Sequence, residues 1–588
     1  MNRVLTYYLK PYYLRMTFGF VIKFGGTIMD LLLPWILAHV IDNVIPQNNP
    51  RMVFVWGGLM ILCAVFAWLG NVIANRMASK VARDTTEQVR HDLFSKIIYL
   101  SNQSTDAFTK PSLISRLTSD TYNLHQMLGR VQRLGVRAPI LLIGGILITL
   151  TLDPVLTLIL VSVLPFIVLI MTSASKRGIP MYSRLQEALD QFVRLVREDI
   201  AGIRVIKALS KTDYERERFA EINEEVVKIE KKAGMTMAIV NPSMNFFLNI
   251  GLVLVILAGA YRVNAGLSEV GKILAFMTYF TIILNAMMSI SKMFVIISKA
   301  VASANRIVAV LDAQDERDLE ILNADETSPV DSSAESGTQT NKPSMITFDH
   351  VSFSYNHVEN NLTDINFDIK KGETLGIIGE TGSGKSTIVS LLLRFYDATE
   401  GQISIDGKPI QAQSIKELRR HFGVVFQNDA LFEDTITENV RLGRDLSEDE
   451  IKQAILYAQA KEFVEDEKRG YYDKLNIKGA NLSGGQKQRI LIARALAAHP
   501  DILVLDDSSS ALDYRTDAML RGELREHFED TTTVIIAQRI SSIMHADHIL
   551  VLEDGAMIGY GTHEELLASC PVYQEIGRSQ MGISAGNS

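Results

Sequence analysis

Six long apolar segments in the first 300 residues constrain this chain more than any other feature of its sequence. A helix needs about 20 predominantly apolar residues to cross the hydrocarbon core of a bilayer. The alternative, buried helices of a large soluble protein, fits poorly with segments of this length and number. We therefore predict six membrane-spanning helices, over about Thr17–Val44, Val53–Ala78, Leu134–Leu152, Leu156–Thr172, Met235–Tyr261 and Ile273–Phe294.

The charges between the segments predict which side of the membrane each connection faces. The three short links carry few basic residues, whereas the two long connections are rich in Lys and Arg. This asymmetry places both long connections, and with them both termini, in the cytoplasm. The long connections contain few Gly or Pro residues, so the membrane helices are expected to continue into them. Turns near Ser101–Lys110 and Ser210–Tyr214 are expected to form small elements that face a soluble domain.

Several polar residues lie inside the predicted spans, where they usually face a cavity or a partner. Asp30 is the strongest candidate for a cavity residue, and Asp42 is a candidate for an external gate. For Lys23 and Lys292 two explanations are equally good: the side chain faces a cavity, or it reaches back to the membrane surface.

The composition changes after residue 312. Residues 313–342 are acidic, rich in Ser and Thr and nearly free of aromatic residues, which predicts a flexible linker. The chain is therefore divided into a transmembrane domain over 1–312 and a soluble domain over 343–588. The net charge of −8 argues against general binding of nucleic acid. No removable signal peptide is expected at the N-terminus.

The soluble half carries a phosphate-loop pattern in LGIIGETGSGKST. Backbone N–H groups of such a glycine-rich turn wrap phosphates, Lys385 neutralises the outer phosphates, and Ser386 ligates Mg²⁺. A second strand, DILVLDD, ends about 120 residues later at Asp506, which is expected to hold Mg²⁺ through water. We predict an ATP and Mg²⁺ site whose loop residues are Gly379, Thr381, Gly382, Ser383, Gly384, Lys385, Ser386 and Thr387.

Between these motifs lies NLSGGQKQR, and with it the chain resembles the ATP-binding cassette (ABC) proteins. Over nearly its full length it resembles a bacterial half-size exporter of the cytoplasmic membrane. The fold implied is an all-α six-helix transmembrane domain fused to an α/β P-loop nucleotide-binding domain. The resemblance also implies that two cassettes dimerise head to tail, each ATP lying between the phosphate loop of one chain and the signature of the other.

The resemblance assigns further roles residue by residue. Tyr355 corresponds to the aromatic residue that stacks on adenine, and Gln427 to the glutamine that senses Mg²⁺, so that Ser386, Gln427 and Asp506 form the metal site. Asp513 belongs to the loop that communicates across the cassette dimer. The signature residues expected to cap a partner's ATP are Ser483, Gly484, Gly485 and Gln486.

Two positions depart from the family pattern. The catalytic glutamate is replaced by Asp507, whose carboxylate sits roughly 1 Å or more back from the attacking water, a displacement that costs about a hundredfold in rate. The histidine that contacts the γ-phosphate is replaced by Gln538, which donates a hydrogen bond but carries no positive charge. This combination resembles the weaker subunit of a heterodimeric multidrug-type exporter, whose partner is a homologous half-transporter with the glutamate and histidine intact.

The function expected from these features is ATP-driven export of amphipathic or hydrophobic compounds by a heterodimer. A lipid flippase and a peptide exporter share the same architecture. An ATP-gated channel or a regulatory ABC protein is a separate class that an impaired site also fits. A homodimer stays open as well, although it would contain two impaired sites.

Overall fold

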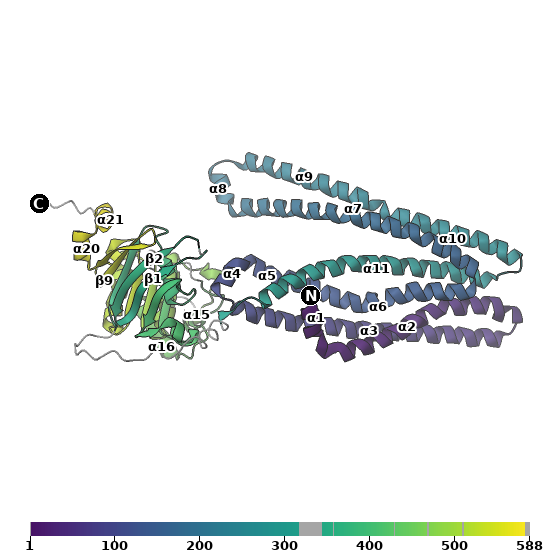
Figure 1. Ribbon diagram of the computed structural model, residues 1–588, viewed down its shortest axis with the longest axis horizontal. Helices are drawn as coiled ribbons and strands as arrows, with labels where there is room; N and C mark the ends of the chain where they lie inside the picture. The colour runs from purple at the N-terminus through teal and green to yellow at the C-terminus, as the bar shows by residue number, and fades with distance from the viewer. Residues whose placement is uncertain are drawn as a thin grey trace. The chain divides into compact units, whose positions relative to one another are not determined.

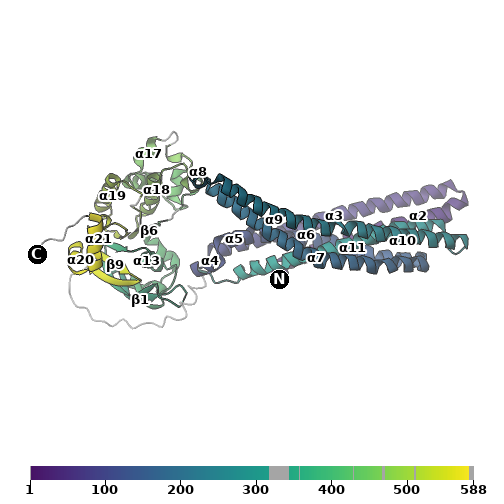
Figure 2. The same ribbon diagram turned by 90° about the horizontal axis from the view of Figure 1, so that it is seen from above.

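A computed structural model describes residues 2–316, 344–356, 358–427, 430–466, 470–508 and 511–581 of the chain. The chain forms two compact units. The first comprises Met1–Ile98 and Lys110–Asp312, and the second comprises Tyr99–Thr109 and Ala313–Ser588. Figures 1 and 2 show the long helices of the first unit and the sheet of the second. From residue 317 onward, the linker predicted over 313–342 lies outside the described residues.

The first unit contains six helical stretches that are long and apolar enough to cross a membrane, and each includes one of the predicted segments. Two of its helices, α3 and α7, have 49 and 48 residues. At 1.5 Å per residue each is about 70 Å long, more than twice the hydrocarbon thickness. The helices of this unit are α1 (Asn2–Leu9), α2 (Tyr13–His39), α3 (Pro50–Ile98), α5 (Lys110–Ser115), α6 (Thr121–Leu152), α7 (Pro154–Ala201), α8 (Ile203–Ala208), α9 (Thr212–Ala238), α10 (Val240–Asn264) and α11 (Val270–Leu311), with π-helical turns at Val40–Val44 and Arg116–Asp120.

Carboxylates at the short links cap the membrane helices. The side chain of Asp153 accepts hydrogen bonds from the first backbone N–H groups of α7. It also forms an ion pair with Arg262 at 2.9 Å. Asp42, the candidate for an external gate, accepts from the backbone N–H groups of Gly271 at 2.6 Å and Lys272 at 3.0 Å. It therefore satisfies N–H groups that the start of α11 cannot bond internally.

The polar residues near the middle of α2 are paired with other helices. Asp30 forms an ion pair with Arg137 of α6 at 3.0 Å and accepts a hydrogen bond from Asn71 of α3. Lys23 is buried and donates to Asn71 and Asn75 at 2.8 and 3.0 Å, so its side chain does not reach back to the membrane surface. Asp30 thus belongs to an interhelical network that compensates its charge inside the unit.

The second unit is built on a ten-stranded sheet in the order β5-β4-β1-β2-β10-β9-β3-β8-β7-β6. Strands β3, β9, β8, β7 and β6 contain the buried aliphatic runs, and the antiparallel strands β1, β2, β4 and β5 lie beyond β10. The strands are β1 (Ser344–Phe353), β2 (Leu362–Lys370), β3 (Thr374–Gly379), β4 (Glu400–Ile405), β5 (Lys408–Pro409), β6 (Phe422–Val425), β7 (Ile502–Asp506), β8 (Thr532–Ile536), β9 (His548–Glu553) and β10 (Ala556–Gly561).

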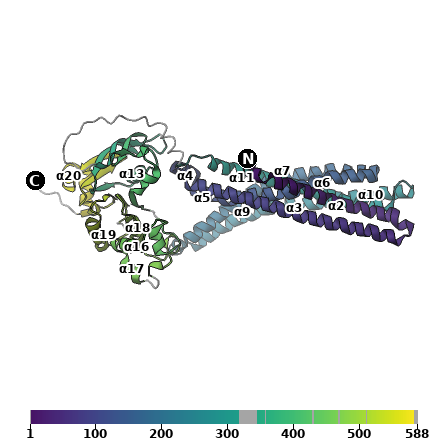
Figure 3. The same ribbon diagram turned by 90° about the horizontal axis from the view of Figure 1, so that it is seen from below.

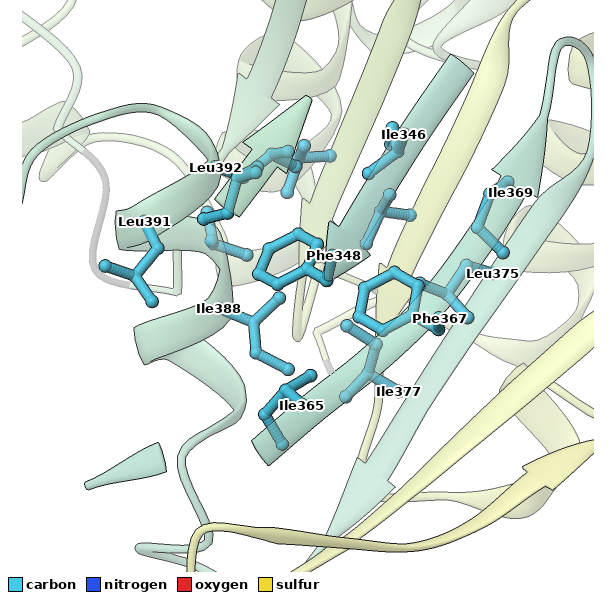
Figure 4. Packing of buried hydrophobic residues seen from close by; sticks show 14 of the residues in the cluster. Ile346, Phe348, Ile365, Phe367, Ile369, Leu375, Ile377, Ile388, Leu391 and Leu392 are labelled. Atoms are coloured by element: carbon cyan, nitrogen blue, oxygen red, sulfur yellow. The ribbon is translucent and has the colours of Figure 1, made fainter. Parts of the chain in front are cut away.

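The sheet is covered by helices through three apolar clusters among the described residues. In the core shown in Figure 4, Phe348 and Phe367 stack at a ring distance of 4.7 Å, and Ile388 of α13 packs in the same cluster. This packing anchors the helix that follows the phosphate loop. The helices of the unit, several of them labelled in Figure 3, are α4 (Asn102–Phe108), α13 (Lys385–Leu392), α14 (Ile415–Arg420), α15 (Ile436–Arg441), α16 (Glu448–Tyr457), α17 (Lys461–Asp466), α18 (Gly484–Leu496), α19 (Tyr514–His527), α20 (His563–Ser569) and α21 (Pro571–Met581).

The small element expected near Ser101–Lys110 is helix α4, and it belongs to the second unit. The phenol of Tyr396 donates a 2.5 Å hydrogen bond to Asp106 of α4. Leu100 forms an isolated antiparallel bridge with Asp315, and Glu316 donates its backbone N–H to the carbonyl of Tyr99 at 2.9 Å. These contacts join a segment from the first 110 residues to the cassette.

Candidate nucleotide site

The phosphate loop connects β3 to α13. Gly382 and Gly384 have φ values of 93° and 97°, in the left-handed region that glycine enters without steric cost. Gly384 is the N-cap of α13. The backbone N–H groups of the loop and the positive end of the helix can therefore interact with the same anion. Gly379 ends β3, and Ser383 is buried beneath the loop.

Lys385, the first residue of α13, folds back over the loop. Its ammonium group donates to the carbonyl oxygens of Gly379 at 2.8 Å and Glu380 at 2.6 Å. Burial lowers the pKa of Lys385, and Asp506 and Asp507 oppose that shift. The ammonium group is thus held at a position from which its positive charge can neutralise the outer phosphates of a nucleotide.

The predicted metal residues Ser386 and Asp506 lie together. The hydroxyl of Ser386 donates to Oδ2 of Asp506 at 3.2 Å, and Asp506 is 6% exposed at the end of β7. Burial raises the pKa of Asp506, with the hydrogen bond from Ser386 acting in the opposite direction. A hydroxyl and a carboxylate beside a phosphate loop are the oxygen ligands that fit Mg²⁺.

Asp507 receives two amide groups on one oxygen atom. The Nε2 groups of Gln427, after β6, and Gln538, after β8, donate to its Oδ2 atom at 3.2 and 3.1 Å. Asp507 itself follows β7 with a φ of 51°, a backbone region that aspartate tolerates better than most residues. The third predicted metal residue, Gln427, therefore points at Asp507, and both departures from the family pattern meet at this carboxylate.

These residues line a cavity of about 410 Å³. Five of its lining residues were not predicted from the sequence: Ile536 at the end of β8, and Asn360, Asn361, Asp554 and Gly555. The last four come from the β1–β2 and β9–β10 connections, which the strand order brings beside β3. The predicted residues that line the cavity are Thr381, Gly382, Gly384, Lys385, Ser386, Thr387, Gln427, Asp506, Asp507 and Gln538.

Tyr355 stands beside the loop with its ring 43% exposed. Its hydroxyl donates to Thr387 at 3.4 Å, and its ring makes an edge contact with Tyr396 at 5.0 Å. The position suits the predicted contact with an adenine base.

The signature residues form a helix start of their own. Ser483 is the N-cap of α18 and exchanges hydrogen bonds with Gln486 in a capping box. Gly484 and Gly485 form the first turn, and none of these four lines the 410 Å³ cavity among the residues that the structure describes. The signature turn is therefore separate from the cavity at the phosphate loop.

The predicted communication loop adjoins the signature turn. A Cβ atom on Gly485 would lie 3.1 Å from the carbonyl oxygen of Ala511, so the two segments approach closely. Asp513 caps α19 through the backbone N–H of Thr516 at 2.9 Å, and that bond lowers the pKa of Asp513. Ser510, in the same loop, lies outside the described residues.

Six membrane-length helices joined to a phosphate-loop domain with its own signature helix define an ABC transporter of the half-size exporter class. Two family profiles agree, one for the ABC transporter transmembrane region over residues 16–287 and one for the ABC transporter over residues 362–510. The chain belongs to this family. It is a multi-pass membrane protein with an ATP-hydrolysing cassette, and the family binds ATP with Mg²⁺.

Individual relatives match over the full length. The uncharacterized ABC transporter ATP-binding protein YfiB of Bacillus subtilis is 35% identical and covers 100% of both chains. A fatty acid ABC transporter ATP-binding/permease protein of Mycobacterium bovis is 31% identical over 91% of this chain and 83% of its own. The solved structure of a bacterial Atm1-family ABC exporter with ATP bound superposes with a TM-score of 0.78 over 97% of this chain and 99% of that one, at 24% identity, and it confirms the fold.

Proposed function

We propose that this chain is the ATP-binding but weakly hydrolysing half of a heterodimeric exporter of amphipathic or hydrophobic, multidrug-type compounds. It spans the bacterial cytoplasmic membrane with both termini and the cassette in the cytoplasm. Its partner is a homologous half-transporter that keeps the catalytic glutamate and the histidine. The signature at Ser483–Gln486 completes the partner's ATP site.

One observation carries this proposal: the amides of Gln427 and Gln538 both donate to Oδ2 of Asp507. A carboxylate oxygen has two lone pairs, and two donors occupy both. Proton transfer from an attacking water to that oxygen would first have to displace one of the amides. The shorter side chain of aspartate, set back from the water position, weakens general-base action further.

The residues expected to bind nucleotide and Mg²⁺ are intact, in contrast to the residues expected to catalyse hydrolysis. Lys385 and the pair Ser386–Asp506 keep the geometry that nucleotide and Mg²⁺ require. The capping box of α18 leaves the glycine N–H groups of the signature turn available to an outside phosphate. ATP retention with slow hydrolysis, and a working signature for a partner, follow from this division.

An amphipathic substrate is supported by one relative. The Mycobacterium bovis protein named as a fatty acid transporter shares 31% identity with this chain over most of its length. Fatty acids combine an apolar chain with a charged head, which is the general chemistry proposed for the exported compounds.

The test is ATP hydrolysis by the chain purified together with a candidate partner half-transporter that keeps the catalytic glutamate, in three forms. The first is unchanged, the second carries Gln in place of the partner's catalytic glutamate, and the third adds Asp507→Ala. We expect the second form to lose nearly all activity. Substantial activity that survives in the second form and disappears in the third would show that Asp507 is a competent catalyst and would overturn the proposal.

A further inference from the structure

A cavity of about 910 Å³ lies within the membrane unit between α7, α9, α10 and α11. This volume is near the upper end of the roughly 300–1,000 Å³ that small-molecule sites occupy. Figure 1 shows α7 running beside α9 and α10, the three helices that supply most of the wall. The cavity is separate from the nucleotide site and lies in the other unit.

Each of the four helices contributes one methionine to the apolar wall. Met171 comes from α7, Met237 from α9, Met244 from α10 and Met288 from α11. Unbranched thioether side chains adapt to apolar ligands of varied shape. Gly178 of α7 lets the side chain of Met237 approach closely, because a Cβ atom there would lie 2.7 Å from the sulfur of Met237.

Two lysines supply the charge. Lys292 and Lys299 lie two helical turns apart on one face of α11, about 10 Å along its axis. No carboxylate lines the cavity, and no hydrogen bond or ion pair reaches either lysine, among the residues that the structure describes. Three other cations of the membrane unit have side-chain partners: Lys23 donates to two asparagines, Arg137 pairs with Asp30, and Arg262 pairs with Asp153.

The charged and apolar walls are arranged along the helices. On α11, Met288 lies nearer the short link before Val270, and Lys299 lies nearer the end of the helix at Leu311. Met171 of α7 likewise precedes Gln186, which lies farther toward the long connection. Both lysines therefore lie toward the end of the cavity near the long connection, where Leu189 and Val295 also line it, and Met171 and Met288 lie toward the other, apolar end.

We propose that this cavity binds a long-chain carboxylate, with the carboxylate at Lys292 and Lys299 and the chain against the methionines. The inference rests on the proposed export of amphipathic compounds and names the substrate class. A cationic amphiphile would place its charge beside two uncompensated ammonium groups, which disfavours it.

The volume is sufficient for a single long chain. A 150 Å³ cavity holds one benzene molecule, or about 25 Å³ per carbon atom, so 910 Å³ holds about 36 heavy atoms. A carboxylate of about 16 to 18 carbons therefore fits with water around its head.

The experiment uses the full chain in nanodiscs of phosphatidylcholine and a palmitate that carries a photoreactive diazirine near the end of its chain. We expect saturable labelling near Met171, Met244 and Met288. Unlabelled palmitate should compete at least tenfold better than hexadecanol, which has the same chain without the charge. Lys292→Gln with Lys299→Gln should weaken labelling at least tenfold, and the matched pair Lys231→Gln with Lys232→Gln, outside the cavity, should not.

A second variant provides an independent test in case the double lysine variant does not fold. Met244→Trp fills the apolar end, keeps both lysines and should also abolish labelling. Equal competition by palmitate and hexadecanol, or unchanged labelling in both cavity variants, would overturn the inference. Stronger competition by phosphatidylglycerol than by palmitate would assign the cavity to a two-chain lipid and would overturn it too.

ATP-dependent efflux of a neutral lipophilic dye, measured with the partner half in the same preparation, separates this inference from the proposed function. Dye efflux without palmitate labelling refutes the carboxylate site and leaves the proposed exporter standing. Palmitate labelling without ATP-dependent transport of dye or palmitate refutes the exporter and leaves the binding site standing.

Discussion

The side-chain amide of Gln538 donates a 3.1 Å hydrogen bond to Oδ2 of Asp507, joining the two catalytic positions at which this chain departs from its family. The bond spans β8 and β7, neighbouring strands of the sheet. A histidine at 538 would present a different donor geometry, and a glutamate at 507 would reach farther. The two replacements therefore act on one catalytic position.

Restoring both residues should raise hydrolysis at this site. We expect Asp507→Glu with Gln538→His to increase the rate of ATP hydrolysis by about tenfold to a hundredfold, because a displacement of roughly 1 Å costs about that much. The measurement is ATPase activity with the partner's catalytic glutamate replaced by Gln. Adding Asp506→Asn should remove the gain, and a gain that persists without Asp506 would contradict a metal-assisted reaction here.

The dependence of ATP affinity on Mg²⁺ should weaken as the pH falls. Burial raises the pKa of Asp506, so this carboxylate takes up its proton at a higher pH than an ordinary aspartate, whose pKa is about 3.9. The protonated group is a poor ligand for Mg²⁺. The measurement is the ratio of the ATP affinity with Mg²⁺ to that with EDTA, from about pH 8 to about pH 5. This ratio should decline more steeply with falling pH than it does in Asp506→Asn. The variant is the control because protonation of ATP itself affects both proteins equally.

Loss of the signature cap should affect a partner's ATP site. Ser483→Ala removes a capping bond worth about 1 kcal/mol, so amide hydrogen exchange in the first turn of α18 should accelerate about fivefold. ATPase activity of the two-chain complex should fall as well. Ser447→Ala removes an equivalent capping box from α16 and is the matched control. If both variants lower ATPase activity equally, the cap acts only on stability.

Coupling between the cassette and α4 should depend on a single phenol. Tyr396→Phe keeps the ring contact with Tyr355 and removes the hydrogen bond to Asp106. We expect transport per ATP hydrolysed to fall severalfold with little change in ATPase activity. Tyr560→Phe removes a phenol bond of 2.6 Å to the carbonyl of Asp368, elsewhere in the cassette, and should leave the ratio unchanged.

The spans and the phosphate loop could be predicted because their signals are local. Membrane helices need only a run of apolar residues, and the loop needs glycine, lysine and serine at fixed spacing. The pairing of Asp30 with Arg137 could not be predicted, since 107 residues separate them and only helix packing brings them together. The capping role of Asp42, across 229 residues, is hidden for the same reason.

The shared hydrogen bonding of Gln427 and Gln538 to Asp507 could not be predicted, because it depends on the order of the strands in the sheet. Both departures were visible in the sequence, and so was Gln427, but their shared hydrogen-bond acceptor was not. Strands β6, β7 and β8 are adjacent in the sheet, although about 80 residues separate Gln427 from Asp507. Asn361 and Gly555 reach the nucleotide cavity through the same kind of long-range strand pairing.

The membership of Tyr99–Thr109 in the second unit has a consequence for proteolysis. The backbone passes between the two units three times, after Ile98, Thr109 and Asp312. A protease that cuts once within residues 317–343 would sever the covalent link to the cassette but leave α4 and Glu316 attached to the membrane helices. Asp106 and Glu316 still bind Tyr396 and Arg419, so the cleaved cassette should stay with the membrane fraction instead of being released.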